Sequence, residues 1–200
     1  MTGREDEIKF RLAGAEDLRR LLAGLPGPAD VVAQENIYLD TADLRLAGRM
    51  AMLRIRVSGP DARLTLKRGT EVEAGYFRSI EVEAALAAEV LEGILADPPS
   101  VWRLDLPPVG EARSLIGEAP LAVIGRLRNE RSAFRAEGFR VEVDRMVFPD
   151  GSAEYEVELE TAEPDRARRW LGGEFARLGV RAEPGRETKF ERLLRKLGTR

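Results

Sequence analysis

The chain has 200 residues, no histidine and no cysteine, and its 32 basic and 35 acidic side chains leave a formal charge of −3. This composition excludes a Ser-His-Asp triad, a cysteine nucleophile, a disulfide and a zinc site built on histidine or cysteine. A bound metal must therefore have oxygen ligands, which favours Mg²⁺, Mn²⁺ or Ca²⁺. The near-neutral charge gives no sign of a nucleic-acid partner, and no long apolar run predicts a membrane partner or secretion. We expect a cytoplasmic protein.

The first half of the chain alternates predicted strands with short helices. Charged residues at 5, 7, 9 and 11 alternate with Ile8, Phe10 and Leu12, which is the period of a strand. Leucines at 18, 21, 22 and 25 have the period of an amphipathic helix. Strands are expected over 35–39, 50–57, 63–68 and 75–83, with a turn or helix at 42–48 and a helix over 86–96.

The second half is expected to run from a connector through three strands to two helices. Four prolines between positions 97 and 110 predict a loop, followed by a short helix over 111–117. Strands are expected over 121–135, 139–148 and 153–161, and helices over 165–178 and 188–197. The last helix is expected to bury Phe190, Leu193, Leu194 and Leu197. We interpret residues 1–200 as a single domain.

Six of the predicted strands carry charged residues on one face and apolar residues on the other. The row Glu154, Glu156, Glu158 and Glu160 would repel itself without a cationic partner. An open antiparallel sheet with one wet face accounts for each strand singly. A barrel with its charged face inward accounts for all six if a polyanion with divalent cations fills the lumen. We expect an α+β fold, mainly antiparallel β: a closed eight-stranded β-barrel with a charged lumen and helices packed outside.

A series of short motifs runs through nearly the whole chain. In chain order they are Glu5-Asp6-Glu7-Ile8-Lys9, Tyr38-Leu39-Asp40-Thr41, Leu53-Arg54-Ile55-Arg56, Leu64-Thr65-Leu66-Lys67, Arg78 with Glu81 and Glu83, Arg131-Ser132-Ala133-Phe134, Asp144, Glu156-Val157-Glu158-Leu159-Glu160 and Thr188-Lys189-Phe190-Glu191-Arg192. The series resembles the CYTH superfamily, the triphosphate tunnel metalloenzymes. The resemblance implies an eight-stranded tunnel barrel that hydrolyses or cyclises triphosphate compounds with divalent metal.

The resemblance also implies roles for the motif residues. Two ions, Mg²⁺ or Mn²⁺, would be held by Glu5, Glu7, Glu158 and Glu160, with Asp144 and Glu156 as neighbours or water-mediated ligands. The phosphates would be bound by Lys9, Arg54, Arg56, Lys67, Arg131 and Lys189. Tyr38 and Lys67 are candidates for proton handling, with strand packing and plain phosphate binding as their alternatives. Arg78, Arg126 and Arg128 are out of phase with neighbouring motif residues, so the sequence does not decide whether their side chains face the lumen.

Within this family we expect hydrolysis of inorganic tripolyphosphate. We expect the protein to be a monomer or a homodimer, and its binding partner to be this small-molecule triphosphate. Class IV adenylate cyclases often carry a His-Phe pair before the first motif, and this chain has no histidine. Animal thiamine triphosphatases carry a tryptophan at the position of Met52. Thiamine or nucleoside triphosphate hydrolysis, adenylate cyclase activity and non-catalytic polyphosphate binding stay open as alternatives. A pure binder would need the basic residues but not the acidic set.

Overall fold

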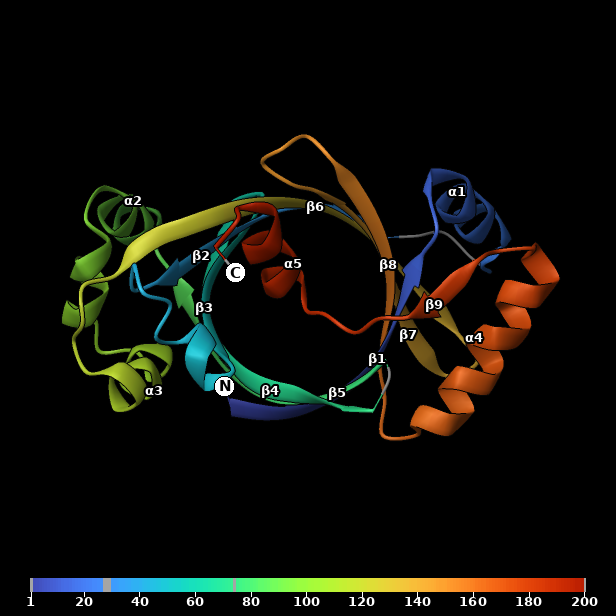
Figure 1. Ribbon diagram of the computed structural model, residues 1–200, viewed down its shortest axis with the longest axis horizontal. Coiled ribbons are helices and arrows are strands. Elements are labelled where there is room, and N and C mark those ends of the chain that lie inside the picture. The colour runs from blue at the N-terminus through green and yellow to red at the C-terminus, as the bar shows by residue number, and fades with distance from the viewer. Residues whose placement is uncertain (1, 27–29, 74, 200) are drawn as a thin grey trace.

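The computed structural model describes residues 2–26, 30–73 and 75–199, and its strands form a closed antiparallel barrel (Figure 1). The strands are β1 (Thr2–Leu12), β2 (Asp30–Asp40), β3 (Ala51–Ser58), β4 (Asp61–Glu73), β5 (Tyr76–Leu86), β6 (Ala122–Ala136), β7 (Phe139–Val147) and β8 (Ala153–Glu160). They pair in the order β5-β4-β3-β2-β6-β7-β8-β1, and β1 also pairs with β5, which closes the ring. The predicted α+β fold with a closed eight-stranded barrel is confirmed.

Helices cover two opposite sides of the barrel (Figure 1). The α-helices are α1 (Ala15–Gly24), α2 (Ala88–Ala96), α3 (Pro107–Ile116), α4 (Pro164–Leu178) and α5 (Lys189–Lys196), and the short 3-10 helices are η1 (Ala47–Arg49) and η2 (Pro98–Arg103). α2, η2 and α3 pack on β2 to β5, whereas α1 and α4 pack on β1, β7 and β8. Within the described residues, no helix is both long enough and apolar enough to cross a membrane.

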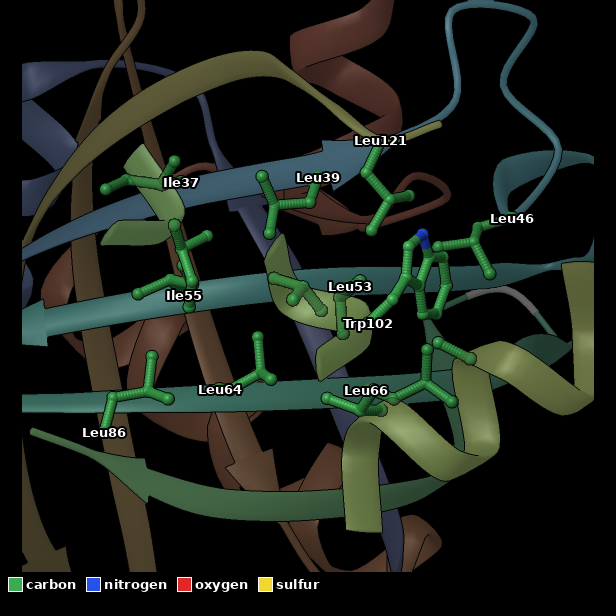
Figure 2. Close-up of a cluster of buried hydrophobic side chains, with 14 of the residues drawn as sticks. Ile37, Leu39, Leu46, Leu53, Ile55, Leu64, Leu66, Leu86, Trp102 and Leu121 are labelled. Atoms are coloured by element: carbon green, nitrogen blue, oxygen red, sulfur yellow. The ribbon is translucent and has the colours of Figure 1, made fainter. Parts of the chain in front are cut away.

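The apolar side chains of the barrel strands point outward, toward these helices. Figure 2 shows one such cluster, in which Leu53 of β3 and Leu66 of β4 lie beside Trp102 of η2. The indole N–H of Trp102 donates to the carbonyl of Ala119 at 2.9 Å, so the ring is buried without an unpaired polar atom. Because successive side chains of a strand alternate between faces, the charged residues between them point into the barrel.

α5 is the exception to the expectation that the helices pack outside. It lies within the ring of strands in Figure 1, and Phe190, Leu193 and Leu194 pack against residues of β2, β6 and β7. Thr188 caps its start through a reciprocal bond with Glu191. The predicted burial of Leu197 is wrong, since it is 37% exposed. A helix outside the barrel needs one apolar stripe. α5 also carries a basic stripe, formed by Lys189, Arg192 and Lys196, whose side chains pair with carboxylates of β7 and β8.

Three smaller features of the structure were not predicted from the sequence. The stretch 97–110, predicted as a loop, contains η2 and the start of α3, because Pro98 and Pro107 occupy first turns, where proline needs no N–H partner. β2 begins at Asp30 rather than near residue 35, since it pairs with β6 along its whole length. A further short strand, β9 (Ala182–Pro184), pairs with the end of β1 and is too short to show a period.

Candidate active site

Two adjoining cavities occupy the inside of the barrel. The α5 cavity, of about 390 Å³, is lined by charged strand residues together with Met50, Met52 and Phe190. The N-terminal cavity, of about 330 Å³, opens near Gly3 and shares several of the charged residues. The predicted residues that line one or both are Glu5, Glu7, Lys9, Tyr38, Arg54, Arg56, Lys67, Arg131, Glu158, Glu160 and Lys189.

Asp144, Glu156 and Glu158 form a compact buried group, here called the acidic triad. Asp144 lies directly opposite Glu156 across the β7–β8 pairing, and each of the three offers a carboxylate oxygen within 4.8 Å of the others. The ammonium of Lys189 lies 2.9 Å from Asp144, 2.6 Å from Glu156 and 2.7 Å from Glu158. The triad therefore surrounds a cation already, and its hard oxygen donors suit Mg²⁺ or Mn²⁺.

Two carboxylates of the triad, Asp144 and Glu158, are held in their charged forms. Burial alone would raise the pKa of Asp144, but the charges of Lys189 and Arg131 outweigh burial and lower it. The same balance, with Lys9 added, keeps the pKa of Glu158 well below its usual range. In return, the pKa of Lys189 is raised, because the charges of the three carboxylates outweigh its own burial. Metal and Lys189 would thus share the same carboxylate oxygens.

The predicted metal residues on β1 are not members of this triad. Lys67 binds both Glu5 and Glu7, and Lys9 bridges Glu7 at 3.1 Å to Glu158 at 2.9 Å. Glu160 is exposed, and its pKa is raised by partial burial and by the nearby charges of Glu5, Glu142 and Glu7. Among the described residues, the compact acidic group thus contains Asp144 and Glu156, which sequence reasoning placed as neighbours, rather than Glu5, Glu7 and Glu160.

Arg54 and Arg56 of β3, here called the basic wall, lie across the barrel from β8 of the triad. Three strands separate β3 from β8 on either side, β4, β5 and β1 one way and β2, β6 and β7 the other. On β3, Arg54 pairs with Glu81 at 3.2 Å, and the Nε of Arg56 donates to Asn36 at 3.0 Å. Within the part of the chain that the structure describes, Arg56 makes no ion pair. Burial and the charges of Arg54 and Arg131 lower its pKa to about 10. The described part of the tunnel thus holds a cation without a counterion.

Four residues whose roles or facing the sequence left open receive a clear position. The ring of Tyr38 is 1% exposed and stacks on Phe190 with centroids 4.7 Å apart, so it packs α5 in place. Arg78 binds Asp6 at 2.9 Å, and Arg126 lies 3.7 Å from Glu35. Arg126 and Arg128 are exposed and alternate with inward-facing residues, so their side chains point away from the lumen, whereas Arg78 is exposed but also lines the α5 cavity.

Glu142 and Arg192 are charged residues at the site that were not among the predicted site residues. Glu142 of β7 lines both cavities and binds Arg131. Its parity with Asp144 could have identified it. Arg192 of α5 is 2% exposed and binds Oε2 of Glu156, whereas Lys189 lies beside Oε1. Its place in the last motif was visible in the sequence, but its partner was not.

The fold and the site define an eight-stranded antiparallel barrel whose lumen, unlike that of most small barrels, is lined by charged residues. Residues 3–193 match the CYTH domain model, and the chain belongs to this family. The family is metal-dependent, and the acidic triad could hold such a metal. No curated relative matches the chain.

Solved structures with the same fold include two at more than a quarter identity. One is HpAC1 from Hippeastrum, an assigned adenylyl cyclase described as having a dominant triphosphatase activity, with a TM-score of 0.88, 27% identity and 94% of each chain covered. Another is an assigned adenylate cyclase of Bacillus halodurans, with a TM-score of 0.76, 26% identity and coverage of 95% of this chain and 98% of that one. A conserved hypothetical protein of Pyrococcus furiosus, at 17% identity and a TM-score of 0.58, covers 92% of this chain and 98% of its own and shares the fold.

Proposed function

We propose that this protein hydrolyses inorganic tripolyphosphate in a metal-dependent reaction. The observation that carries the proposal is the pair of opposed walls inside the barrel. The acidic triad on β7 and β8 suits a divalent metal, and Arg56 on the facing strand is a cation without a carboxylate partner among the described residues. A metal bound to a polyanion would neutralise both sets of charges, because the metal neutralises the carboxylates and the phosphates neutralise the arginines.

The residues divide into two roles in this proposal. Asp144, Glu156 and Glu158 would hold the metal, which when bound neutralises phosphate charge and lowers the pKa of coordinated water. The phosphate oxygens would be bound by Lys9, Arg54, Arg56, Lys67, Arg131 and Lys189. Phosphoryl transfer depends mainly on positioning and charge neutralisation, so a site without histidine or cysteine is chemically sufficient. Glu5, Glu7 and Glu160 would serve a second ion nearer the N-terminal cavity.

The comparison with HpAC1 supports hydrolysis over cyclisation, since that relative has a dominant triphosphatase activity. The second candidate is hydrolysis of a nucleoside or thiamine triphosphate. It is favoured by Met50, Met52 and Leu194, which give the α5 cavity an apolar wall that an organic group could contact.

The test compares phosphate release from tripolyphosphate, ATP and thiamine triphosphate, with Mg²⁺ and with Mn²⁺, at neutral and alkaline pH. We expect the fastest release from tripolyphosphate and none without metal. Asp144→Asn should abolish turnover, whereas the matched control Asp150→Asn, in an exposed turn, should retain it. If all three compounds stay intact, the hydrolase proposal fails. Cyclic AMP from ATP would identify a cyclase, and tight binding without turnover a binder.

A further inference from the structure

Arg192 is a buried cation that the proposed chemistry does not use. It lies one turn into α5, is 2% exposed, and is absent from the described linings of both cavities. One nitrogen donates to Glu156, and another lies 3.4 Å from Glu154. Burying a guanidinium is costly unless its partners are well placed, so its position calls for a role.

Glu156 is held from both ends by α5. Its Oε2 accepts from Arg192, and its Oε1 lies 2.6 Å from the ammonium of Lys189 at the centre of the triad. Lys189 and Arg192 are three residues apart and therefore lie on one face of the helix. With Oε2 bound to Arg192, Oε1 is the oxygen that Glu156 presents to the ammonium shared with Asp144 and Glu158.

We propose that Arg192 is a positioning residue that fixes the orientation of Glu156 and thereby sets the affinity of the triad for its divalent metal. The inference rests on the proposed function, which assigns the metal to this triad. Groups that hydrogen-bond to a metal ligand typically change metal affinity 10–100-fold when they are removed. The guanidinium fork reaches Glu154 and Glu156 together, which the single ammonium of a lysine does less well.

Lys196 provides the matched control on the same helix. Its ammonium lies 3.2 Å from Glu154 and 3.7 Å from Asp150, and it does not contact Glu156. If the basic stripe of α5 only anchors the helix to β8, loss of either side chain should affect the metal site alike. If Arg192 positions Glu156, the effects should differ.

The experiment measures Mn²⁺ binding to the full chain by calorimetry without substrate, for the wild type, Arg192→Met, Arg192→Lys and Lys196→Met. We expect Arg192→Met to weaken Mn²⁺ binding about 10–100-fold, Arg192→Lys to recover part of the loss, and Lys196→Met to bind like the wild type. Electrostatics alone predicts the opposite sign, because removing a positive charge near the site should tighten binding. In turnover assays, the Mn²⁺ concentration for half-maximal rate should rise, while KM for tripolyphosphate at saturating Mn²⁺ stays unchanged.

Unchanged or tighter Mn²⁺ binding by Arg192→Met overturns the positioning role and leaves the proposed function intact. Failure of the wild type to bind Mn²⁺ overturns the metal site and this inference together. If Arg192→Met does not fold, Glu154→Gln supplies the measurement, because it removes the second anchor of Arg192 and leaves the triad in place. In that case, Mn²⁺ affinity equal to the wild type for both Arg192→Lys and Glu154→Gln refutes the proposal.

Discussion

Lys189→Met tests whether the lysine and a metal share one position. The substitution keeps the length of the side chain and the helical propensity but removes the ammonium from within 3 Å of Asp144, Glu156 and Glu158. Without metal, three buried carboxylates then lose their common cation. Removal of one partner from a buried ion pair costs about 3–5 kcal/mol. A change of 1 kcal/mol shifts Tm by about 2–4 °C in chains of this size, so we expect a fall of about 6–20 °C.

Added metal should reverse much of this loss. A ligand present at a hundredfold excess over its Kd stabilises the folded state by about 2.7 kcal/mol. In Lys189→Met the metal meets vacated carboxylates and delivers this stabilisation in full. In the wild type the metal must first displace Lys189 from the same oxygens, so its net effect on Tm is smaller.

The assay is a thermal melt of both proteins at neutral pH, with and without Mn²⁺, alongside Lys196→Met. Lys196 pairs with Glu154 and Asp150 near the end of α5 and contacts no member of the triad, so its loss should leave the metal response unchanged. Equal Tm increases on Mn²⁺ addition in the wild type and in Lys189→Met would refute the shared position. So would a Lys189→Met variant that is as stable as the wild type without metal.

Three further predictions follow from the same contacts. Arg56→Met should raise KM for tripolyphosphate about 10–150-fold, because a charged hydrogen bond contributes about 1.5–3 kcal/mol. Its Tm should change little, because removal of a cation without an ion pair in the described structure offsets the loss of its hydrogen bond to Asn36; steady-state kinetics and a melt check both. Leu193→Ala should lower the free energy of unfolding in urea by about 2–5 kcal/mol, because Leu193 is fully buried between α5 and the barrel. The metal-free protein should lose stability in acid: the lowered pKa values of Asp144 and Glu158 stabilise the fold fully above about pH 4.5, and this contribution disappears as pH falls through their folded values. Melts from pH 7 to 3 should show that loss, and Asp144→Asn should reduce it.

The barrel could be predicted because the alternation of residues within each strand shows which side chains lie on its apolar face and which lie on its charged face. In β8, the glutamates alternate with Tyr155, Val157 and Leu159, and the apolar row needs helices while the acidic row needs cations. The location of α5 could not be predicted in the same way. Its apolar stripe specifies an apolar partner without saying whether that partner lies outside the barrel or within it. The inner apolar patch forms only when β2 and β7 pair with the two edges of β6, which brings Tyr38, Leu127 and Met146 together.

The alternation of side chains along the strands could not decide which carboxylates form the acidic triad. Glu156, Glu158 and Glu160 share one face, so the sequence alone could not rank them. Their distance to Asp144 is decided by the register of β7 against β8, which places Glu156 opposite Asp144 and Glu160 beyond it. Register is set by the turn that joins the two strands, and a change of two residues would have kept every side chain on its face.

The four lysines of this arginine-rich chain share one kind of contact. Each ammonium bridges at least two carboxylates: Lys9 joins Glu7 to Glu158, Lys67 joins Glu5 to Glu7, Lys189 joins the triad and Lys196 joins Asp150 to Glu154. An ammonium is a compact charge with three donors that can point to several acceptors around it. Acidic groups therefore converge around each of these lysines, as they also do around Arg131, which pairs with Glu142, Asp144 and Glu158. The same convergence is what a divalent cation requires, so these positions mark where charge is concentrated in the tunnel.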